Sequence, residues 1–248
     1  MTRGDGAVRP RPAGPRPEPA LRTEARAEPI ARRSSGDEAA RYIRRAIFDG
    51  TLRPGARVPQ DQVAEALGIS RIPVREALIA LEREGWVTIE LHRGAFVSAL
   101  DAQAVRDHYE LFGLVYGFAA TRALDRGADG LGDRLADLAR QFAATDDTRA
   151  LGRQAVAFHA AIVDAAASPR IRVVLQAMPG LVPGDFFALV PDAVAVERRG
   201  LAAIAKAVQR RDGAQAAEEY HRMLRRLGEQ VVRLFEARGL FARVDART

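Results

Sequence analysis

Residues 63–78 read VAEALGISRIPVREAL, and this stretch decides the fold of the N-terminal part of the chain. Apolar residues at helical spacing before Gly68 predict a short helix that this glycine ends. Ser70 is a good N-cap for a second helix, and Pro73 falls in the first turn, where a missing N–H costs little. The second helix has one apolar face, formed by Val74, Ala77, Leu78 and Leu81. A short helix, a tight turn and a second helix are typical of a helix-turn-helix unit.

The flanking sequence extends this unit on both sides. Helical spacing of Ala40, Ile43 and Ile47 predicts an earlier helix that begins near Asp37. After the second helix, residues 86–89 and 95–97 read as two strands, with Arg93-Gly94 in the turn between them. Three helices followed by a hairpin predict a winged helix-turn-helix domain. In this geometry the N-terminal residues of the last helix face the base edges of the DNA major groove.

Two arginines stand at the start of that last helix. Arg71 and Arg75 are four residues apart, so they share one face. An arginine can pair bidentately with guanine or with a phosphate, which suits a DNA-reading helix. For an isolated pair, a solvated helix face with Arg75 bound to a nearby acid is the simpler interpretation. The surrounding motif favours DNA reading.

Sixty contiguous residues carry a resemblance to a known family. Residues 47–55 and 63–78, with Leu81–Val87 and Arg93–Val97 after them, resemble the signatures of the GntR family of bacterial regulators. The resemblance implies that the DNA contacts are made by Ser70, Arg71, Pro73 and Arg75, and at the wing tip, near the minor groove, by Arg93 and Gly94. Asp61 departs from the pattern, because some fatty-acid-responsive members carry a DNA-contacting arginine there. An Asp would repel phosphate, so no contact is expected at this position.

The rest of the chain is helical in pattern. Helices are expected near residues 101–125, 131–144, 150–167, 170–177, 191–211 and 213–237. Short stretches such as Tyr109–Leu111 and Phe158–Ile162 resemble the FadR-like or FCD ligand-binding domain of the same family. The resemblance implies an all-helical bundle around a central pocket. The fold expected is therefore mainly α, with a disordered Arg/Pro-rich tail, a winged helix-turn-helix domain and a helical ligand-binding and dimerisation domain, at residues 1–35, 36–99 and 100–248.

Many FCD domains hold a divalent metal with one Asp and three His. In this chain the four positions are occupied by Ala155, His159, Leu201 and Met223, so one ligand of four remains and we expect no metal. Phe112 stands where related pockets often carry an arginine for a carboxylate. We expect an apolar pocket for a small-molecule effector, such as a fatty acyl or other lipid-derived molecule. Its expected lining residues are Phe112, Tyr116, His159, Leu201 and Met223. A pocket filled by core side chains, with His159 as a packed core histidine, is the alternative.

Composition narrows the function classes. The chain has no cysteine, which excludes disulfides and thiolate chemistry and fits the cytoplasm. Residues 1–35 contribute +4 of the net charge of +6, so charge alone is weak evidence for nucleic acid. No apolar run approaches the ~18 residues of a membrane span. Neither a nucleophile with its base nor a phosphate-binding glycine motif is present, so we expect no enzyme and no cofactor.

These observations predict a ligand-responsive transcriptional regulator in the cytoplasm. We expect it to act as a repressor and to bind a pseudo-palindromic double-stranded DNA operator as a homodimer, since one winged domain makes too few contacts. Two alternatives stay open. One is a helical scaffold protein with vestigial DNA binding, and the other is a regulator that senses a small carboxylate.

Overall fold

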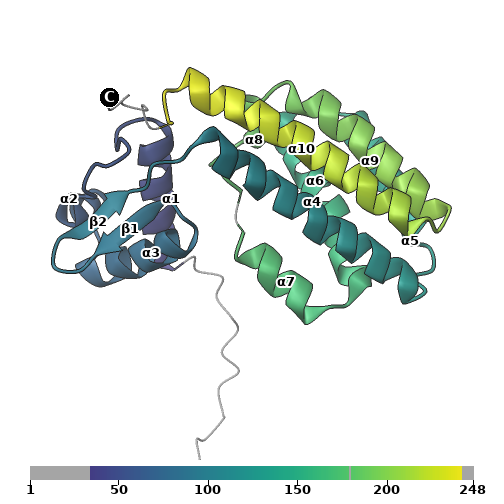
Figure 1. Cartoon of the computed structure of the whole chain (residues 1–248), viewed down its shortest axis with the longest axis horizontal. Coiled ribbons are helices and arrows are strands. Elements are labelled where there is room, and N and C mark those ends of the chain that lie inside the picture. Colours follow the sequence, from purple (N-terminus) through teal and green to yellow (C-terminus); the bar gives the residue numbers. More distant parts are fainter. Residues whose placement is uncertain (1–33, 179, 242–248) are drawn as a thin grey trace, which may run out of the picture. The chain divides into compact units, whose positions relative to one another are not determined.

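A computed structural model describes residues 34–178 and 180–241, so the predicted tail at residues 1–35 lies almost wholly outside the described residues. The chain is mainly helical with one small antiparallel hairpin, as the sequence predicts (Figure 1). The elements are α1 (Ser35–Phe48), α2 (Gln60–Leu67), α3 (Arg71–Arg83), β1 (Val87–Glu90), β2 (Gly94–Val97), α4 (Ala102–Asp125), α5 (Leu131–Ala143), α6 (Thr148–Ala166), α7 (Pro169–Gln176), α8 (Phe186–Leu189), α9 (Ala193–Gln209) and α10 (Gly213–Ala237).

The N-terminal elements form a winged helix-turn-helix. A capping box starts α1: the hydroxyl of Ser34 accepts a hydrogen bond from the backbone N–H of Asp37, whose carboxylate accepts one from the N–H of Ser34. Both α1 and α2 pack against α3. Their shared core is apolar and closely buried, and it includes Ile43, Ile47, Val63, Val74, Leu78 and Leu81. Burial of this face of α3 leaves the opposite face free to meet another molecule.

The hairpin follows α3 directly. Its register pairs Val87 with Val97 and Thr88 with Phe96. The sequence predicted that the first strand would begin at Trp86, but it begins at Val87, because the backbone N–H of Trp86 donates to the carbonyl of Leu81 in the turn after α3. The side chain of Trp86 is buried. Val87, Ala95 and Val97 are also buried, so one face of the hairpin closes the core of this unit.

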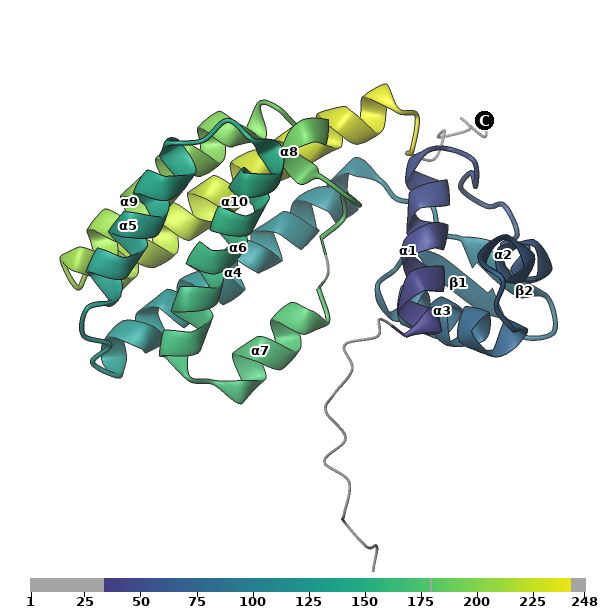
Figure 2. The ribbon, with the colours of Figure 1, turned by 180° about the vertical axis from the view of Figure 1, so that it is seen from behind.

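The long helices of the C-terminal part form a closed ring. Each contacts the next around the ring in the order α4, α6, α5, α9, α10 and back to α4 (Figures 1 and 2). Figure 2 shows α5 and α6 in front, while α10 lies behind them. The ring encloses a core rich in large side chains, including Phe142, Phe158, Leu201, Ile204, Tyr220 and Phe235. This arrangement confirms the all-helical bundle that the sequence predicts.

The contact of α4 with α10 is unusually close, and two glycines permit it. A Cβ atom on Gly113 would lie 3.0 Å from the Cα of His221, and one on Gly117 would lie 3.0 Å from the Cα of Ala217. Real Cβ atoms seldom approach a backbone carbon so closely, so side chains at these positions would push the helices apart. The close contact fixes the rotation of α4 about its axis, and thereby the direction in which each of its side chains points.

Helix α8 is the one element that the sequence pattern did not predict. It has four residues, too few to show a helical period. Its N-cap Asp185 accepts hydrogen bonds from the backbone N–H of Ala188 and from the hydroxyl of Thr148 at the start of α6. This pair fastens α8 to α6, so tertiary contacts rather than local periodicity define the element.

In the part of the chain that the structure describes, none of the helices combines the length and the apolar character that a membrane crossing requires.

The substitution Gly117→Val tests the close contact of α4 with α10. We expect it to lower the free energy of unfolding by about 1–3 kcal/mol, because over-packing forces the two helices apart. Urea denaturation followed by circular dichroism measures the change. Gly152→Val in α6 is the matched control, since a Cβ there meets nothing within 4 Å. Equal stability of the two variants would mean that the contact is looser than described.

Candidate DNA-reading surface and effector cavity

Helix α3 presents its N-terminal turns to solvent. Ser70 occupies the N-cap position with an extended backbone, and Arg71 is the first helical residue. Pro73 lies in the first turn and is half-buried. Arg71 and Arg75 are both exposed, on a face adjacent to the one that buries Val74 and Leu78. The residues that the sequence assigned to the major groove therefore stand together at the accessible end of one helix.

Asp61 is the nearest acidic partner of this surface. Its Oδ1 lies 2.6 Å from the Nε of Arg71, and both side chains are largely exposed. An exposed ion pair contributes little to stability, typically about 0–1 kcal/mol, so Arg71 can exchange this partner for another anion. The Asp at this position, which departs from the family pattern, is thus an exchangeable partner of Arg71.

Arg57 joins the same surface, although no sequence motif pointed to it. Its backbone pairs with Phe96 as an isolated antiparallel bridge, which adds a short third edge to the hairpin. The Nε of the flexible Arg57 side chain lies 3.0 Å from the place that a Cβ on Gly94 would occupy. Gly94 has a φ of +107°, which L side chains rarely adopt, so the backbone favours glycine there. Arg57, Arg71 and Arg75 line one surface hollow of about 520 Å³. Two arginines of α3 and one from the segment before α2 thus face the same space.

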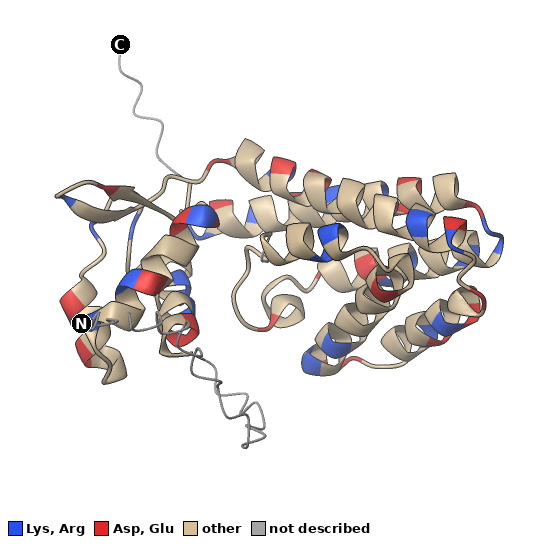
Figure 3. Cartoon of the chain, turned by 90° about the horizontal axis from the view of Figure 1, so that it is seen from below, with Lys and Arg blue, Asp and Glu red and all other residues tan. Residues whose placement is uncertain are grey.

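The wing carries Arg93 at its turn. This side chain pairs with Glu90 and lies over the ring of Phe96, with 5.4 Å between the guanidinium carbon and the ring centroid. His92 has a left-handed backbone with a φ of 62°, which gives the turn its tight shape. Arg93 stays exposed in this arrangement. Figure 3 shows acidic and basic residues interspersed along the helices, so placement rather than bulk charge distinguishes this surface.

The helical bundle holds a cavity of about 710 Å³. Ligand pockets of proteins are typically about 300–1,000 Å³ and mostly apolar, so this one has the size of a small-molecule site. Its walls come from α4, α6, α8, α9 and α10. The apolar and aromatic lining includes Tyr109, Phe112, Tyr116, Val156, Phe186, Phe187, Leu224 and Leu227.

The structure brings three of the five expected ligand residues to this cavity. Phe112, Tyr116 and His159 line it. Leu201 is fully buried in the core and is not among the lining residues. Met223 packs against Gly200 of α9 and borders a separate, smaller hollow. The two missing residues were placed by their match to metal-ligand positions, and their side chains pack between α9 and α10 instead.

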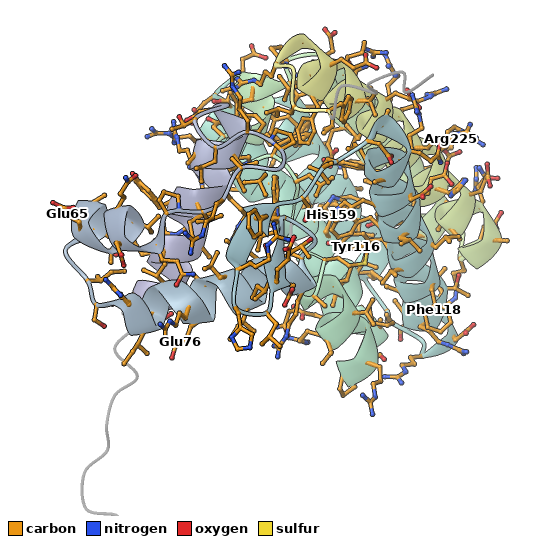
Figure 4. The ribbon with its side chains drawn as sticks, turned by 60° about the vertical axis from the view of Figure 1, so that its left-hand side comes forward. Glu65, Glu76, Tyr116, Phe118, His159 and Arg225 are labelled. Carbon is orange, nitrogen blue, oxygen red and sulfur yellow. The ribbon has the colours of Figure 1, made fainter. Side chains whose placement is uncertain are left out.

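His159 is held by two neighbours. Its Nδ1 lies 3.2 Å from the hydroxyl of Tyr220, and its Nε2 lies 3.2 Å from Oε1 of Glu197. The ring of Tyr116 lies beside it, with 4.9 Å between the ring centroids. Figure 4 shows Tyr116 and His159 together inside the bundle. Both ring nitrogens of His159 therefore already have partners within the protein.

Glu197 is a candidate site residue that, like Arg57, no sequence motif indicated. It is 3% exposed and is the one charged residue that is buried in the described part of the chain. Among the described residues, His159 is the only basic group within ion-pair distance of it. A buried carboxylate is costly unless it is paired or hydrogen-bonded, so this pair is a deliberate feature of the cavity. The sequence held a signal for this residue, because Glu197 is an acid that falls between Ala193 and Leu201 on the apolar face of α9.

The carboxylate of Glu197 affects the pKa values of the tyrosines in the bundle. Burial, together with the negative charge of Glu197, raises the pKa of Tyr116 to about 12. The same two causes raise the pKa of Tyr109, and burial raises that of Tyr220. The phenols therefore remain neutral hydrogen-bonding groups in the folded protein at ordinary pH.

The donor set does not fit a metal of the kind found in FCD domains. Ala155 and Leu201 offer no ligand atom, and the thioether of Met223 is a soft donor packed against α9. Within residues 34–178 and 180–241, no group of three or more His, Cys, Asp or Glu side chains is placed to hold an ion.

Two arginines of α6 line the opening of the cavity. Arg149 and Arg153 are among the lining residues and are also exposed, so they lie where the cavity meets solvent. Arg153 makes a loose pair with Asp147, at 3.9 Å. The cavity thus has a basic opening, an aromatic wall and an acidic group, Glu197, in its interior.

Comparison with known families now identifies the chain. Residues 36–97 match the bacterial regulatory proteins of the gntR family, and residues 107–226 match the FCD domain. The chain therefore joins a gntR-family domain to an FCD domain. Its matched segments coincide with the winged helix-turn-helix and with most of the helical bundle. This family consists of transcriptional regulators rather than enzymes, as the sequence resemblance implied.

Among the relatives is an HTH-type transcriptional regulator of Mycobacterium tuberculosis. It is 32% identical over 151 residues, which cover 61% of this chain and 62% of that relative. The match thus spans less than two thirds of the relative's length.

Solved structures share the fold at low sequence identity. A Listeria monocytogenes protein, Lar, described as controlling expression of the agr system, has a TM-score of 0.57 at 18% identity and covers 82% of this chain and 98% of its own. The McbR/YncC protein of E. coli has a TM-score of 0.55 at 17% identity and covers 83% of this chain and 99% of its own. These matches establish the architecture alone.

The raised pKa values predict a loss of stability in alkali. Tyr116 keeps its proton in the folded state up to about pH 12, whereas an unfolded tyrosine ionises near pH 10. The stabilising contribution is therefore complete below about pH 10 and is lost as the pH rises toward about 12. Urea unfolding at a series of alkaline pH values measures the slope.

The substitution Tyr116→Phe should make that alkaline slope shallower, because the variant has no phenol to ionise at this site. Tyr42→Phe in α1, where the side chain is exposed, is the control and should leave the slope as it is. An unchanged slope in the Tyr116 variant would contradict the assigned cause.

Proposed function

We propose that the chain is a ligand-responsive, DNA-binding transcriptional regulator. The single observation that carries the proposal is the cluster of exposed arginines, Arg71 and Arg75 on α3 with Arg57 beside the hairpin, on a winged helix-turn-helix. The match to the gntR family supports it. The domains proposed are residues 36–99 for DNA binding and residues 100–248 for ligand binding and dimerisation.

In this proposal the N-terminal turns of α3 enter the major groove. Arg71 and Arg75 read guanine or clamp phosphate, while Ser70 and Pro73 let the backbone approach the DNA. Arg93 and Gly94 bring the wing to the minor groove. Arg57 supplies a further phosphate contact, since it faces the same space as the two α3 arginines.

A homodimer on a pseudo-palindromic operator follows from the size of this surface. One winged domain contacts a half-site only, and two-fold symmetry doubles the contacts at a fixed spacing. A dimer seated on an operator excludes other proteins from that DNA, so repression is the simplest output. We expect the protein to act in the cytoplasm, where the DNA of a bacterium lies.

The proposed effector is an amphipathic molecule with an apolar chain, such as a fatty acyl compound. The aromatic and leucine lining favours a chain in the interior of the cavity. Of the residues expected to line the pocket, His159 and Tyr116 carry the polar groups that a polar end of the ligand would meet in the interior. However, Glu197 next to His159 repels an anion, whereas Arg149 and Arg153 at the opening attract one. We therefore propose that an anionic end group stays at the opening.

The substitutions Arg71→Ala and Arg75→Ala test DNA reading. Each should weaken binding to the operator by about 1–3 kcal/mol, because each removes a charged contact that can be bidentate. Fluorescence anisotropy with a fragment of the protein's own promoter, in competition with nonspecific DNA at fixed salt, measures the loss.

Arg83→Ala is the matched control, because Arg83 is exposed at the far end of the same helix. It should leave operator binding close to that of the parent protein. If both α3 variants bound the operator normally, the recognition helix would be misplaced. If the parent bound no DNA at all, the alternative of a helical scaffold would be favoured.

A thermal-shift series tests the effector class. Fatty acids should raise the melting temperature increasingly with chain length, since each buried CH₂ contributes about 0.8 kcal/mol and only the folded state binds. Fatty alcohols of equal length should stabilise less, because they lack the anionic group that Arg149 and Arg153 attract.

The double variant Arg149→Ala/Arg153→Ala should remove the difference between acids and alcohols while keeping the dependence on chain length. Arg170→Ala, in the exposed first turn of α7, is the control. Stabilisation by small di- or tricarboxylates alone would favour the competing hypothesis of a small-carboxylate sensor.

A further inference from the structure

Helix α4 has an exposed apolar stripe. Leu111, Leu114 and Phe118 are 51%, 59% and 51% exposed. Their spacing of three and four residues puts them on one face of the helix, opposite the buried residues Val105 and Ala123. Figure 4 places Phe118 at the outer side of the bundle, whereas Tyr116 and His159 lie inside it. A row of large apolar groups on one exposed helix face marks an interaction surface.

Opposite charges stand at the two ends of this stripe. Asp107 lies one turn before Leu111, and Arg122 lies one turn after Phe118, on the same face. Both are exposed, and among the described residues their polar contacts are with close neighbours on α4: Asp107 accepts a hydrogen bond from Gln103, while Arg122 pairs with Asp125 and covers Phe118. Such contacts between exposed neighbours are weak and can be exchanged.

The order along the face is therefore acid, leucine, leucine, phenylalanine, base. When a second, identical helix packs against this face in the antiparallel direction, acidic residues face basic ones and apolar residues face apolar ones. Asp107 then faces the partner's Arg122, and Leu111 faces the partner's Phe118. Leu114 lies close to the partner's Leu114, beside the symmetry axis. A parallel arrangement would instead bring Asp107 against Asp107 and Arg122 against Arg122, which is repulsive.

We propose that α4 is the two-fold interface of the homodimer and that its stripe, Asp107 to Arg122, packs antiparallel against the same stripe of a second copy. A two-fold axis makes each surface meet itself, so the surface must be self-complementary. The stripe of α4 meets this requirement in both apolar and charged residues. An unrelated protein partner would impose no such internal symmetry on it. The inference rests on the proposed dimer and adds its face and its register.

Charge reversal tests the pairing. Asp107→Arg and Arg122→Asp should each weaken dimerisation by about tenfold or more, because each places two like-charge contacts in every dimer. The double variant Asp107→Arg/Arg122→Asp should restore it, since the pairs are re-formed in reverse order. Sedimentation equilibrium of the full chain over a range of concentrations measures the dissociation constant. Failure of the double variant to recover would overturn the proposed register.

Cysteine cross-linking tests the register without altering charge, and the chain has no cysteine of its own. A disulfide requires Cα atoms within about 7 Å. Leu114→Cys should therefore form a linked dimer on oxidation. Leu111→Cys alone should not, because it lies about 10 Å along the axis from its own copy. A mixture of Leu111→Cys and Phe118→Cys proteins should form the mixed dimer. Cross-linking of Leu111→Cys to itself would overturn the register.

A last pair of variants separates this inference from the proposed function. Phe118→Glu should yield a folded monomer that binds the operator poorly, whereas Leu91→Glu, at the exposed hairpin turn, should stay dimeric. If Phe118→Glu stayed dimeric and bound the operator, the proposed α4 interface would be wrong, but the proposal of a dimeric regulator would still hold. If the parent protein were a monomer that bound DNA with full affinity, the proposed dimer itself would fail.

Discussion

The close packing of α4 against α10 is the constraint on which the rest of the bundle depends. Gly113 and Gly117 let the backbones approach, and this fixes the rotation of α4 about its axis. Once the glycine face is turned to α10, Tyr109, Phe112 and Tyr116 line the cavity. The remaining face carries the exposed apolar stripe of Leu111, Leu114 and Phe118. One helix therefore closes the ring, lines the cavity and supplies the surface to which we assign dimerisation.

Glu197 is the central polar group of the cavity. Among the described residues, no Lys or Arg lies within ion-pair distance of its carboxylate. Glu197 is buried, and His159 and the tyrosine hydroxyls are the groups near it. Where many FCD domains use three imidazoles and a carboxylate around a metal, this chain keeps one imidazole and adds a carboxylate one turn before the position of Leu201. A carboxylate and an imidazole that bind each other need no ion. With Ala155, Leu201 and Met223 at the other ligand positions and Glu197 on α9, the chain has a hydrogen-bonded pair inside an aromatic cavity in place of the metal-binding pattern.

The sequence alone predicted most of the fold. The bounds of α4, α5 and α10 agree with the predicted ranges to within a residue or so, because long amphipathic helices with clear breaks carry a strong periodic signal. Helix α8 escaped because four residues show no period. The cavity was harder to predict. Leu201 and Met223 were inferred from register with metal ligands, but packing turns them toward the core. Arg57 and Glu197 escaped because their roles depend on contacts between elements that are distant in sequence.

The recognition surface and the cavity each contain a pair of oppositely charged or ionisable groups, but one pair is exposed and the other is buried. On α3, Asp61 holds Arg71 through an exposed ion pair, which water weakens enough for a phosphate or a base to replace the carboxylate. In the bundle, Glu197 and His159 are buried, so their pairing is hard to break and each is costly to leave alone. An exposed pair suits a site that must release its partner to bind DNA. A buried pair suits a rigid part of the cavity lining, which selects a ligand by excluding molecules of the wrong charge. Since this lining carries an acid, the proposed effector keeps its anionic group out of the interior and beside the arginines at the opening.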